Sequence, residues 1–137
     1  MKNPFQLGDV KIYSFVVTEA DFATMEGHMV HEVLSTFALG RSMEWAGRLF
    51  VLEMLEAGEE GIGTMLHVEH HTPAFAGETV EFRATFAALE NRELTCAVEV
   101  WVDERLVATG RTGQRIVRSE KLSARFAALR AGSPTSA

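Results

Sequence analysis

The chain has 137 residues, of which 47% are hydrophobic and 23% charged, and its formal net charge is −6 at pH 7. A chain of this length and composition is predicted to form a single domain over residues 1–130, followed by a disordered tail over residues 131–137. The acidic balance argues against a nucleic-acid binder, and the N-terminal residues lack the apolar core of a signal peptide. No apolar run reaches membrane-spanning length, and the lone Cys96 can form no internal disulfide, so we expect a cytoplasmic protein.

The first third of the chain is predicted to contain a strand, a short helix and an irregular connection. Residues 10–17 (VKIYSFVV) are rich in β-branched and aromatic side chains and indicate a strand. Residues 18–27 (TEADFATMEG) indicate a short helix that begins after Thr18 as N-cap and ends at Gly27. Residues 28–35 show no clear period, and a segment of this kind ahead of a buried helix is expected to form a lid or a pocket wall.

A long apolar helix is predicted over residues 35–56, and the rest of the chain is organised around it. Hydrophobic residues recur along it at helical spacing and also fill most of the remaining circumference, so other elements must wrap it. Glu44 lies in this helix between two large apolar residues, where a carboxylate is costly unless it is paired or has a function. Two explanations stay open: an ion pair with Arg48 or Arg41 at helical spacing, or a catalytic carboxylate.

After the helix, a Gly-rich turn is predicted over residues 57–63 and a strand over residues 62–71. Successive side chains of a strand point to opposite faces, so His70 is expected to point inward with the aliphatic residues. The predicted inward face consists of Ile62, Thr64, Leu66, Val68 and His70. The predicted outward face consists of Met65, His67, Glu69 and His71.

Further strands and a second helix are predicted to complete the chain. Alternation predicts strands over residues 79–88 and 94–102, with their even-numbered residues buried, and a turn at Asn91 and Arg92 between them. A last strand is predicted over residues 106–117 and a helix with a narrow apolar stripe over residues 119–129. A strand, a long helix and four meandering strands indicate an α+β fold with an antiparallel sheet.

Three polar residues are candidates for catalysis. Glu44 is suited to activate a water molecule or to attack directly, and His70 is suited to shuttle a proton. Thr36 lies near the helix N-terminus, where free backbone N–H groups and the helix dipole favour an oxyanion. The structural alternatives are a core histidine bonded to a backbone carbonyl at His70 and a plain N-cap or first-turn hydroxyl at Thr36.

These residues also form a pattern that resembles a known family. The pattern consists of Thr36, seven further residues and Glu44-Trp45-Ala46, then Gly61-Ile62-Gly63-Thr64, then His70 and Gly77. It is similar, over about residues 10–129, to the hot-dog-fold thioesterases of the fluoroacetyl-CoA thioesterase type. The resemblance implies a hot-dog fold, in which a five-stranded antiparallel sheet wraps a long central helix. It also implies a homodimer, or a tetramer of paired dimers, with active sites at the dimer interface.

The resemblance further implies roles for single residues. It implies that Thr36, Glu44 and His70 are the catalytic triad, and that the backbone N–H of Gly63 meets the thioester carbonyl.

Substrate-binding residues are implied at two more places. The fluoroacetyl-specific enzyme has a lid of phenylalanines, whereas this chain has Val30 at that position and Phe22 as the one aromatic residue of the segment. In the last strand Gln114 stands where the family enzyme has an arginine. A general acyl-CoA thioesterase is therefore expected rather than a fluoroacetate-selective one.

The predicted function is hydrolysis of a short or small acyl-CoA thioester to the free acid and CoA. No cofactor is expected, because CoA belongs to the substrate, and neither a nucleic acid nor a membrane is an expected partner. The alternatives are a non-catalytic acyl-CoA-binding hot-dog protein and a hot-dog dehydratase. The H-x-E-x-H pattern of His67, Glu69 and His71 is expected to face outward without holding a functional metal, and Cys96 to be a small buried hydrophobe.

Overall fold

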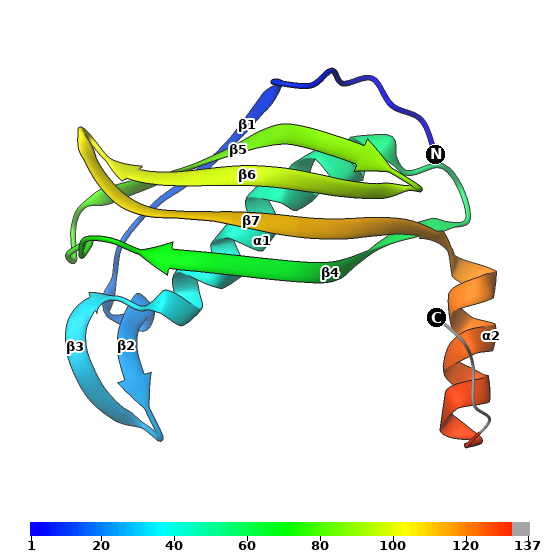
Figure 1. The fold of residues 1–137 in the computed structure, drawn as a ribbon. Coiled ribbons are helices and arrows are strands. Elements are labelled where there is room, and N and C mark those ends of the chain that lie inside the picture. Colours follow the sequence, from blue (N-terminus) through cyan, green and yellow to red (C-terminus); the bar gives the residue numbers. More distant parts are fainter. Residues whose placement is uncertain (133–137) are drawn as a thin grey trace.

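The structure, a computed structural model, describes residues 1–132, so most of the tail predicted over residues 131–137 lies outside the described residues. In chain order the elements are β1 (Val10–Val16), a 3-10 helix (Glu19–Asp21), β2 (Phe22–Met25), β3 (His28–Leu34), α1 (Thr36–Met54), β4 (Glu59–His70), β5 (Thr79–Glu90), β6 (Glu93–Val102), β7 (Arg105–Arg118) and α2 (Ser119–Arg130). Five antiparallel strands form one sheet in the order β1-β5-β6-β7-β4, and β2 and β3 form a separate hairpin (Figure 1). The predicted α+β class and five-stranded antiparallel sheet are confirmed.

The core lies between one face of α1 and the inner face of the sheet (Figure 1). Helical spacing buries one side of α1, and strand alternation buries the even-numbered residues of β5 and β6, as predicted. The largest fully buried side chains include Phe50, Phe82, Phe86, Leu39, Met43 and Met54. The opposite side of α1 is open in this chain, because Phe37, Trp45 and Leu52 are 80%, 41% and 46% exposed. The predicted wrapping of the helix by the sheet is confirmed, and within the single chain it covers one side of α1.

The segment before α1 differs from the prediction. The helix predicted over residues 18–27 is only the 3-10 helix Glu19–Asp21, after which the chain enters β2. Glu26 and Gly27 both have positive φ, at 54° and 78°, which is the geometry of a two-residue hairpin turn rather than of a helix end. Residues 28–34, which showed no period, form β3 because they pair with β2. Strand pairing thus overrides the local helical signal here.

The position of β4 also differs from a simple meander. β5, β6 and β7 follow one another as neighbours, but β4 pairs with β7 and lies at the edge of the sheet. The turn before it consists of residues 57–58 rather than 57–63, and β4 already begins at Glu59. One edge of β4 is consequently free of strand partners within residues 1–132.

A β-bulge at Thr64 interrupts the alternation predicted for this strand. Gly63 is opposite Gln114 and Met65 is opposite Gly113, which leaves Thr64 without a partner in β7. Before the bulge, a Cβ at Gly61 or Gly63 would point at α1, whereas after it the even-numbered side chains do so. His70 therefore points inward as predicted, but Ile62 lies on the opposite face.

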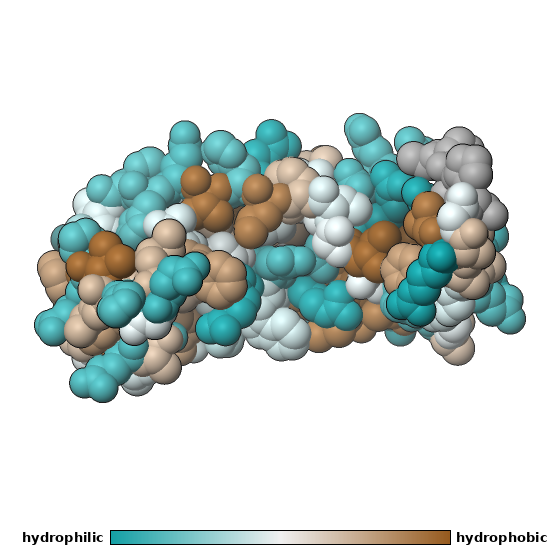
Figure 2. Space-filling model, turned by 90° about the horizontal axis from the view of Figure 1, so that it is seen from below, coloured by the Kyte–Doolittle hydropathy of each residue, from teal (hydrophilic) through white to brown (hydrophobic). Residues whose placement is uncertain are grey.

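Two parts of the chain extend beyond the β4 edge. The β2–β3 hairpin leaves the body at one end of β4, and α2 leaves it at the other end (Figure 1). Between the hairpin and α2, Met65 and Leu66 of β4 are 40% and 45% exposed, and Figure 2 shows hydrophobic side chains on this face. In residues 1–132, no helix has the length and apolar character needed to cross a membrane.

Candidate active site

Thr36 and His70 are brought together by the start of α1 and the end of β4. Ser35 is the N-cap of α1, and its hydroxyl accepts a hydrogen bond of 2.9 Å from the backbone N–H of Ala38. The cap fixes Thr36 as the first residue of the helix. Its Oγ1 lies 3.0 Å from Nδ1 of His70, the last residue of β4. The donor in this hydrogen bond depends on the imidazole tautomer.

Burial favours the neutral form of the His70 imidazole. Burial lowers its pKa below the ordinary value of 6.5, although a backbone hydrogen bond at Thr72 opposes the shift. Nε2 is buried and has no hydrogen-bond partner in residues 1–132. A buried ring nitrogen without a partner is costly in a resting protein, and it is suited to exchange a proton with a bound molecule.

Glu44 and Gly63 form a second pair. The half-buried carboxylate of Glu44 lies so close to β4 that a Cβ built on Gly63 would be 2.4 Å from Oε1. Only a residue without a side chain leaves room for the carboxylate at this position. The ion pair considered for Glu44 is not formed, because neither Arg41 nor Arg48 lies within 4.0 Å of it, and Arg48 Nη1 instead donates to the Gly61 carbonyl at 3.1 Å.

The two pairs are separated within one chain. Thr36 and Glu44 are eight residues apart on α1, which corresponds to about 12 Å along the helix axis. His70 and Gly63 are correspondingly separated along β4, which runs beside the helix. The three predicted catalytic residues therefore lie along one helix–strand seam but do not meet in the single chain.

Gln114 lies behind this seam. It is only 2% exposed, and its Nε2 donates a 3.0 Å hydrogen bond to the backbone carbonyl of Glu44. This bond ties the middle of α1 to β7. The contact with substrate that the resemblance implies for Gln114 stays a prediction.

The hairpin carries the two other predicted substrate-binding residues. Phe22 is partly buried against the core and is paired with Leu34 across the hairpin. Val30 is 49% exposed on β3. Both residues belong to the hairpin that precedes Thr36, but Phe22 is partly buried and Val30 is exposed.

The remaining candidates lie away from the seam. His67 approaches Glu69 at 3.8 Å, and His71 Nε2 lies 2.8 Å from Thr109 Oγ1, both on the far face of β4. Residues 1–132 contain no group of three side chains able to hold a metal. Cys96 is 1% exposed, and burial raises the pKa of its thiol to about 11, so it is not a reactive nucleophile.

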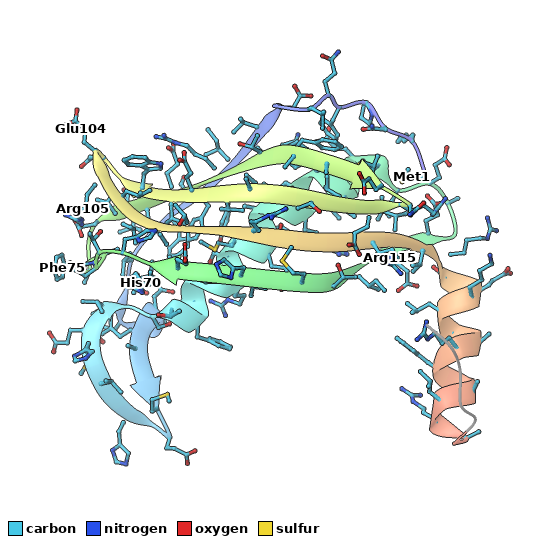
Figure 3. All side chains as sticks on the ribbon, in the orientation of Figure 1. Met1, His70, Phe75, Glu104, Arg105 and Arg115 are labelled. Atoms are coloured by element: carbon cyan, nitrogen blue, oxygen red, sulfur yellow. The ribbon has the colours of Figure 1, made fainter. Side chains whose placement is uncertain are left out.

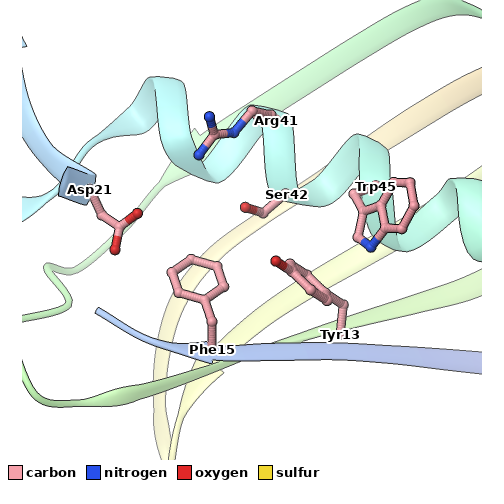
Figure 4. Close-up of a pocket in the computed structure, with 6 residues that line it drawn as sticks. All are labelled: Tyr13, Phe15, Asp21, Arg41, Ser42 and Trp45. Atoms are coloured by element: carbon pink, nitrogen blue, oxygen red, sulfur yellow. The ribbon is translucent and has the colours of Figure 1, made fainter. Parts of the chain in front are cut away.

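Two cavities lined by residues of the described range 1–132 lie outside the seam. One of about 300 Å³ lies between β1 and α1 and is shown in Figure 4; it is lined by Tyr13, Phe15, Asp21, Arg41, Ser42 and Trp45. The other, of about 650 Å³, lies between α2 and the adjoining strands and has a basic rim. Sequence analysis missed the second cavity, although Arg118, Lys121 and Arg125 recur at helical spacing and were its available signal.

Comparisons with known proteins agree with one another. The sequence profile of the fluoroacetyl-CoA-specific thioesterase family matches residues 17–120. A thioesterase superfamily member from Thermus thermophilus is 32% identical, with a TM-score of 0.86 over 93% of this chain and 94% of that one. A mutant of the fluoroacetyl-CoA-specific thioesterase FlK, in complex with fluoroacetate and CoA, is 26% identical, with a TM-score of 0.77 over 86% of this chain and 99% of that one.

A hot-dog-like protein from Thermanaerovibrio acidaminovorans supports the fold. It is 22% identical, with a TM-score of 0.81 over 89% of this chain and 90% of that one. The predicted hot-dog fold is thereby confirmed. No curated protein matches the sequence.

Proposed function

The chain belongs to the fluoroacetyl-CoA-specific thioesterase family and is a thioester hydrolase of the hot-dog fold, and from this premise we propose that it hydrolyses a small acyl-CoA thioester. The products are the free acid and CoA. The complex of FlK with fluoroacetate and CoA supports this class of substrate. CoA is part of the substrate, and the proposal includes no other cofactor.

The carboxylate of Glu44 beside Gly63, which has no ion-pair partner within residues 1–132, is the observation that carries this proposal. A half-buried carboxylate without an ion pair, packed against a residue that has no side chain, is accessible to a ligand on that side. The hydrogen-bonded Thr36 and His70 add a neutral imidazole and a hydroxyl at the N-terminus of the same helix. These groups supply a base or nucleophile, a proton carrier and a hydrogen-bond donor.

Glu44 has two routes to hydrolysis. It removes a proton from a water molecule that attacks the thioester carbonyl, or it attacks the carbonyl itself and forms an anhydride that water then cleaves. In both routes the C–S bond breaks and a C–O bond forms. The proton that the attacking water loses ends on the CoA sulfur, and His70 carries it by accepting a proton at one ring nitrogen and donating one from the other. The backbone N–H of Gly63 stabilises the carbonyl oxygen as its negative charge develops.

A second copy of the chain is needed to complete such a site. The free edge of β4 is a template for strand pairing, and it carries the exposed Met65 and Leu66. If two β4 strands pair antiparallel about a two-fold axis between Leu66 and His67, Gly63 of one protomer lies beside His70 of its partner. Glu44 and Gly63 then face the Thr36–His70 pair of the other chain, and a homodimer has two composite sites. This arrangement closes the gap that separates the pairs within one chain.

The function is tested first with short acyl-CoA substrates and a thiol-release assay. Wild-type protein is expected to release free CoA, and Glu44→Gln is expected to remove hydrolysis while the protein stays folded by circular dichroism. Turnover close to wild type in Glu44→Gln would contradict the role of the carboxylate. Wild-type protein that binds acyl-CoA without releasing thiol would instead be a non-catalytic binding protein.

The composite site is tested by mixing inactive variants. Glu44→Gln and His70→Ala are unfolded together and refolded, so that half of the dimers are mixed. Each mixed dimer keeps one site in which both chains contribute intact residues, so about a quarter of wild-type activity returns. The matched control is Thr36→Ala mixed with His70→Ala, which supplies no intact site and restores nothing. Equal activity in both mixtures, or none in either, would refute the shared site.

The hairpin is proposed to form the acyl end of the site. Phe22 packs against the core and is paired with Leu34, which precedes Thr36 by two residues, and Val30 offers a smaller side chain than phenylalanine on β3. Both residues support a site open to several small acyl groups.

A further inference from the structure

Glu44 and Arg48 lie four residues apart on α1 but do not form an ion pair. Opposite charges at this spacing on a helix usually attract each other and stabilise the helix. Here each charged group instead lies against its own glycine of β4, Glu44 against Gly63 and Arg48 against Gly61. A Cβ built on Gly61 would be 3.4 Å from Nη1 of Arg48. The seam between α1 and β4 thus holds a carboxylate and a cation that are neighbours but are not bonded to each other.

The guanidinium of Arg48 is held in place and still has hydrogen-bond donors to spare. The side chain is half-buried, and its Nη1 donates a 3.1 Å hydrogen bond to the Gly61 carbonyl. A guanidinium carries five N–H donors in a planar fork. The other donors of Arg48 have no acceptor, and the group has no ion-pair partner, among residues 1–132. A carboxylate satisfies such a fork best, because it accepts two parallel hydrogen bonds.

Arg48 lies at the same end of the proposed composite site as the acyl group. Figure 3 shows His70 at one end of β4 and Arg115 beside the other, which is the end that Arg48 contacts. In the proposed pairing of two β4 strands, Gly63 lies beside the partner's His70. The hairpin extends beyond that end of its own β4 (Figure 1), so the partner's hairpin lies on the Gly61 side of the site. Since the hairpin is proposed to form the acyl end, the acyl group points towards Arg48.

We infer that Arg48 determines substrate specificity by binding a second carboxylate at the far end of the acyl group. The inference rests on the proposed function, in which the thioester carbonyl lies at Glu44 and Gly63. Because Gly61 and Gly63 are two residues apart, Arg48 contacts β4 about 6.6 Å along the strand from Glu44. An acyl group such as glutaryl, with three methylene groups between its carbonyl and its carboxylate, spans this separation. Arg48 also offsets the repulsion between the carboxylate of such a substrate and that of Glu44.

The test compares two substrates that differ in one charge: glutaryl-CoA and the same thioester with its free carboxylate replaced by a carboxamide. The measured quantity is the ratio of their kcat/KM values, in which any loss of folded protein cancels. Wild-type protein is expected to favour the carboxylate by about 10-fold or more, because its hydrogen bonds to Arg48 are charged. Arg48→Met is expected to bring the ratio to about one or below. The control Arg41→Met removes the same charge on the β1 side of α1 and is expected to keep the wild-type ratio (Figure 4).

Three outcomes would overturn the inference. A wild-type ratio near one would do so, although turnover of either substrate would leave the proposed function in place. An equal rise in KM for both substrates in Arg48→Met would place Arg48 at a phosphate of CoA instead, and the same loss in Arg41→Met would make the effect one of net charge.

Binding gives a readout that is independent of turnover. In Glu44→Gln, which is expected not to cleave either thioester, calorimetry should show tighter binding of glutaryl-CoA than of the carboxamide. Adding Arg48→Met should remove this difference, and that result would support the role of Arg48 even if the wild-type protein failed to hydrolyse thioesters. Equal binding of the two ligands in Glu44→Gln would count against it.

Discussion

A methyl group added at Gly63 is expected to displace the carboxylate of Glu44 without unfolding the protein. The new Cβ would lie 2.4 Å from Glu44 Oε1, and ordinary contact begins at 3.4 Å, so the oxygen must move by about 1 Å. The carboxylate ends a flexible side chain, so we expect a stability change below about 1 kcal/mol. A shift of this size in a reacting group lowers kcat by about 10²-fold.

Gly61→Ala is the matched control for this prediction. Its Cβ would lie 2.6 Å from Cγ1 of Val51, a core residue that is 0% exposed, so the clash falls on packing rather than on the carboxylate. We expect Gly61→Ala to lower the melting temperature and to leave the kcat of the folded fraction near wild type. Thermal unfolding and thiol release are measured on both variants. The reasoning is refuted if Gly63→Ala keeps wild-type kcat, or if it loses as much stability as Gly61→Ala.

Two further predictions concern His70 and Gln114. Burial lowers the pKa of His70 from its ordinary value of 6.5, so the acidic limb of the kcat profile, along which the imidazole takes up a proton, should have its midpoint below that value. His70→Ala should reduce the rate by about 10²- to 10⁴-fold, whereas His71→Ala, on the other face, should change it little; the opposite result would contradict the assigned faces. Gln114→Leu removes the hydrogen bond to the Glu44 carbonyl. It should lower the free energy of unfolding by about 1 kcal/mol, and it should lower kcat with little change in KM. A raised KM with unchanged kcat would instead indicate that Gln114 touches the substrate.

Periodicity predicted the elements that are governed by burial. The long helix and the inward faces of β5 and β6 follow from apolar spacing alone, and the turn at Asn91 and Arg92 is confirmed by their positive φ of 51° and 67°. The hairpin before α1 could not be predicted in this way, because residues 18–27 carry helical signals and the part that forms β2 becomes a strand only through pairing with β3. The place of β4 at the sheet edge likewise depends on pairing between distant segments.

The candidate site was predictable in its residues but not in its arrangement. Resemblance and strand alternation indicated Thr36 and His70, and the structure brings them to 3.0 Å. The same reasoning placed Glu44 with them, but the pitch of a helix separates residues that are eight positions apart. The catalytic roles, the domain bounds and the cytoplasmic location remain predictions from the sequence.

Because of the bulge at Thr64, the number of residues between Gly63 and His70 in β4 matters as much as the identity of those residues. In a regular strand only one of Gly63 and His70 could face α1, because an odd and an even position lie on opposite faces. The extra residue lets both face the helix. Replacing Thr64 by another residue would preserve this, whereas deleting it would turn one end of the seam away from α1. In related sequences, a gap of one residue between these two positions is therefore more informative about activity than many substitutions in the same strand.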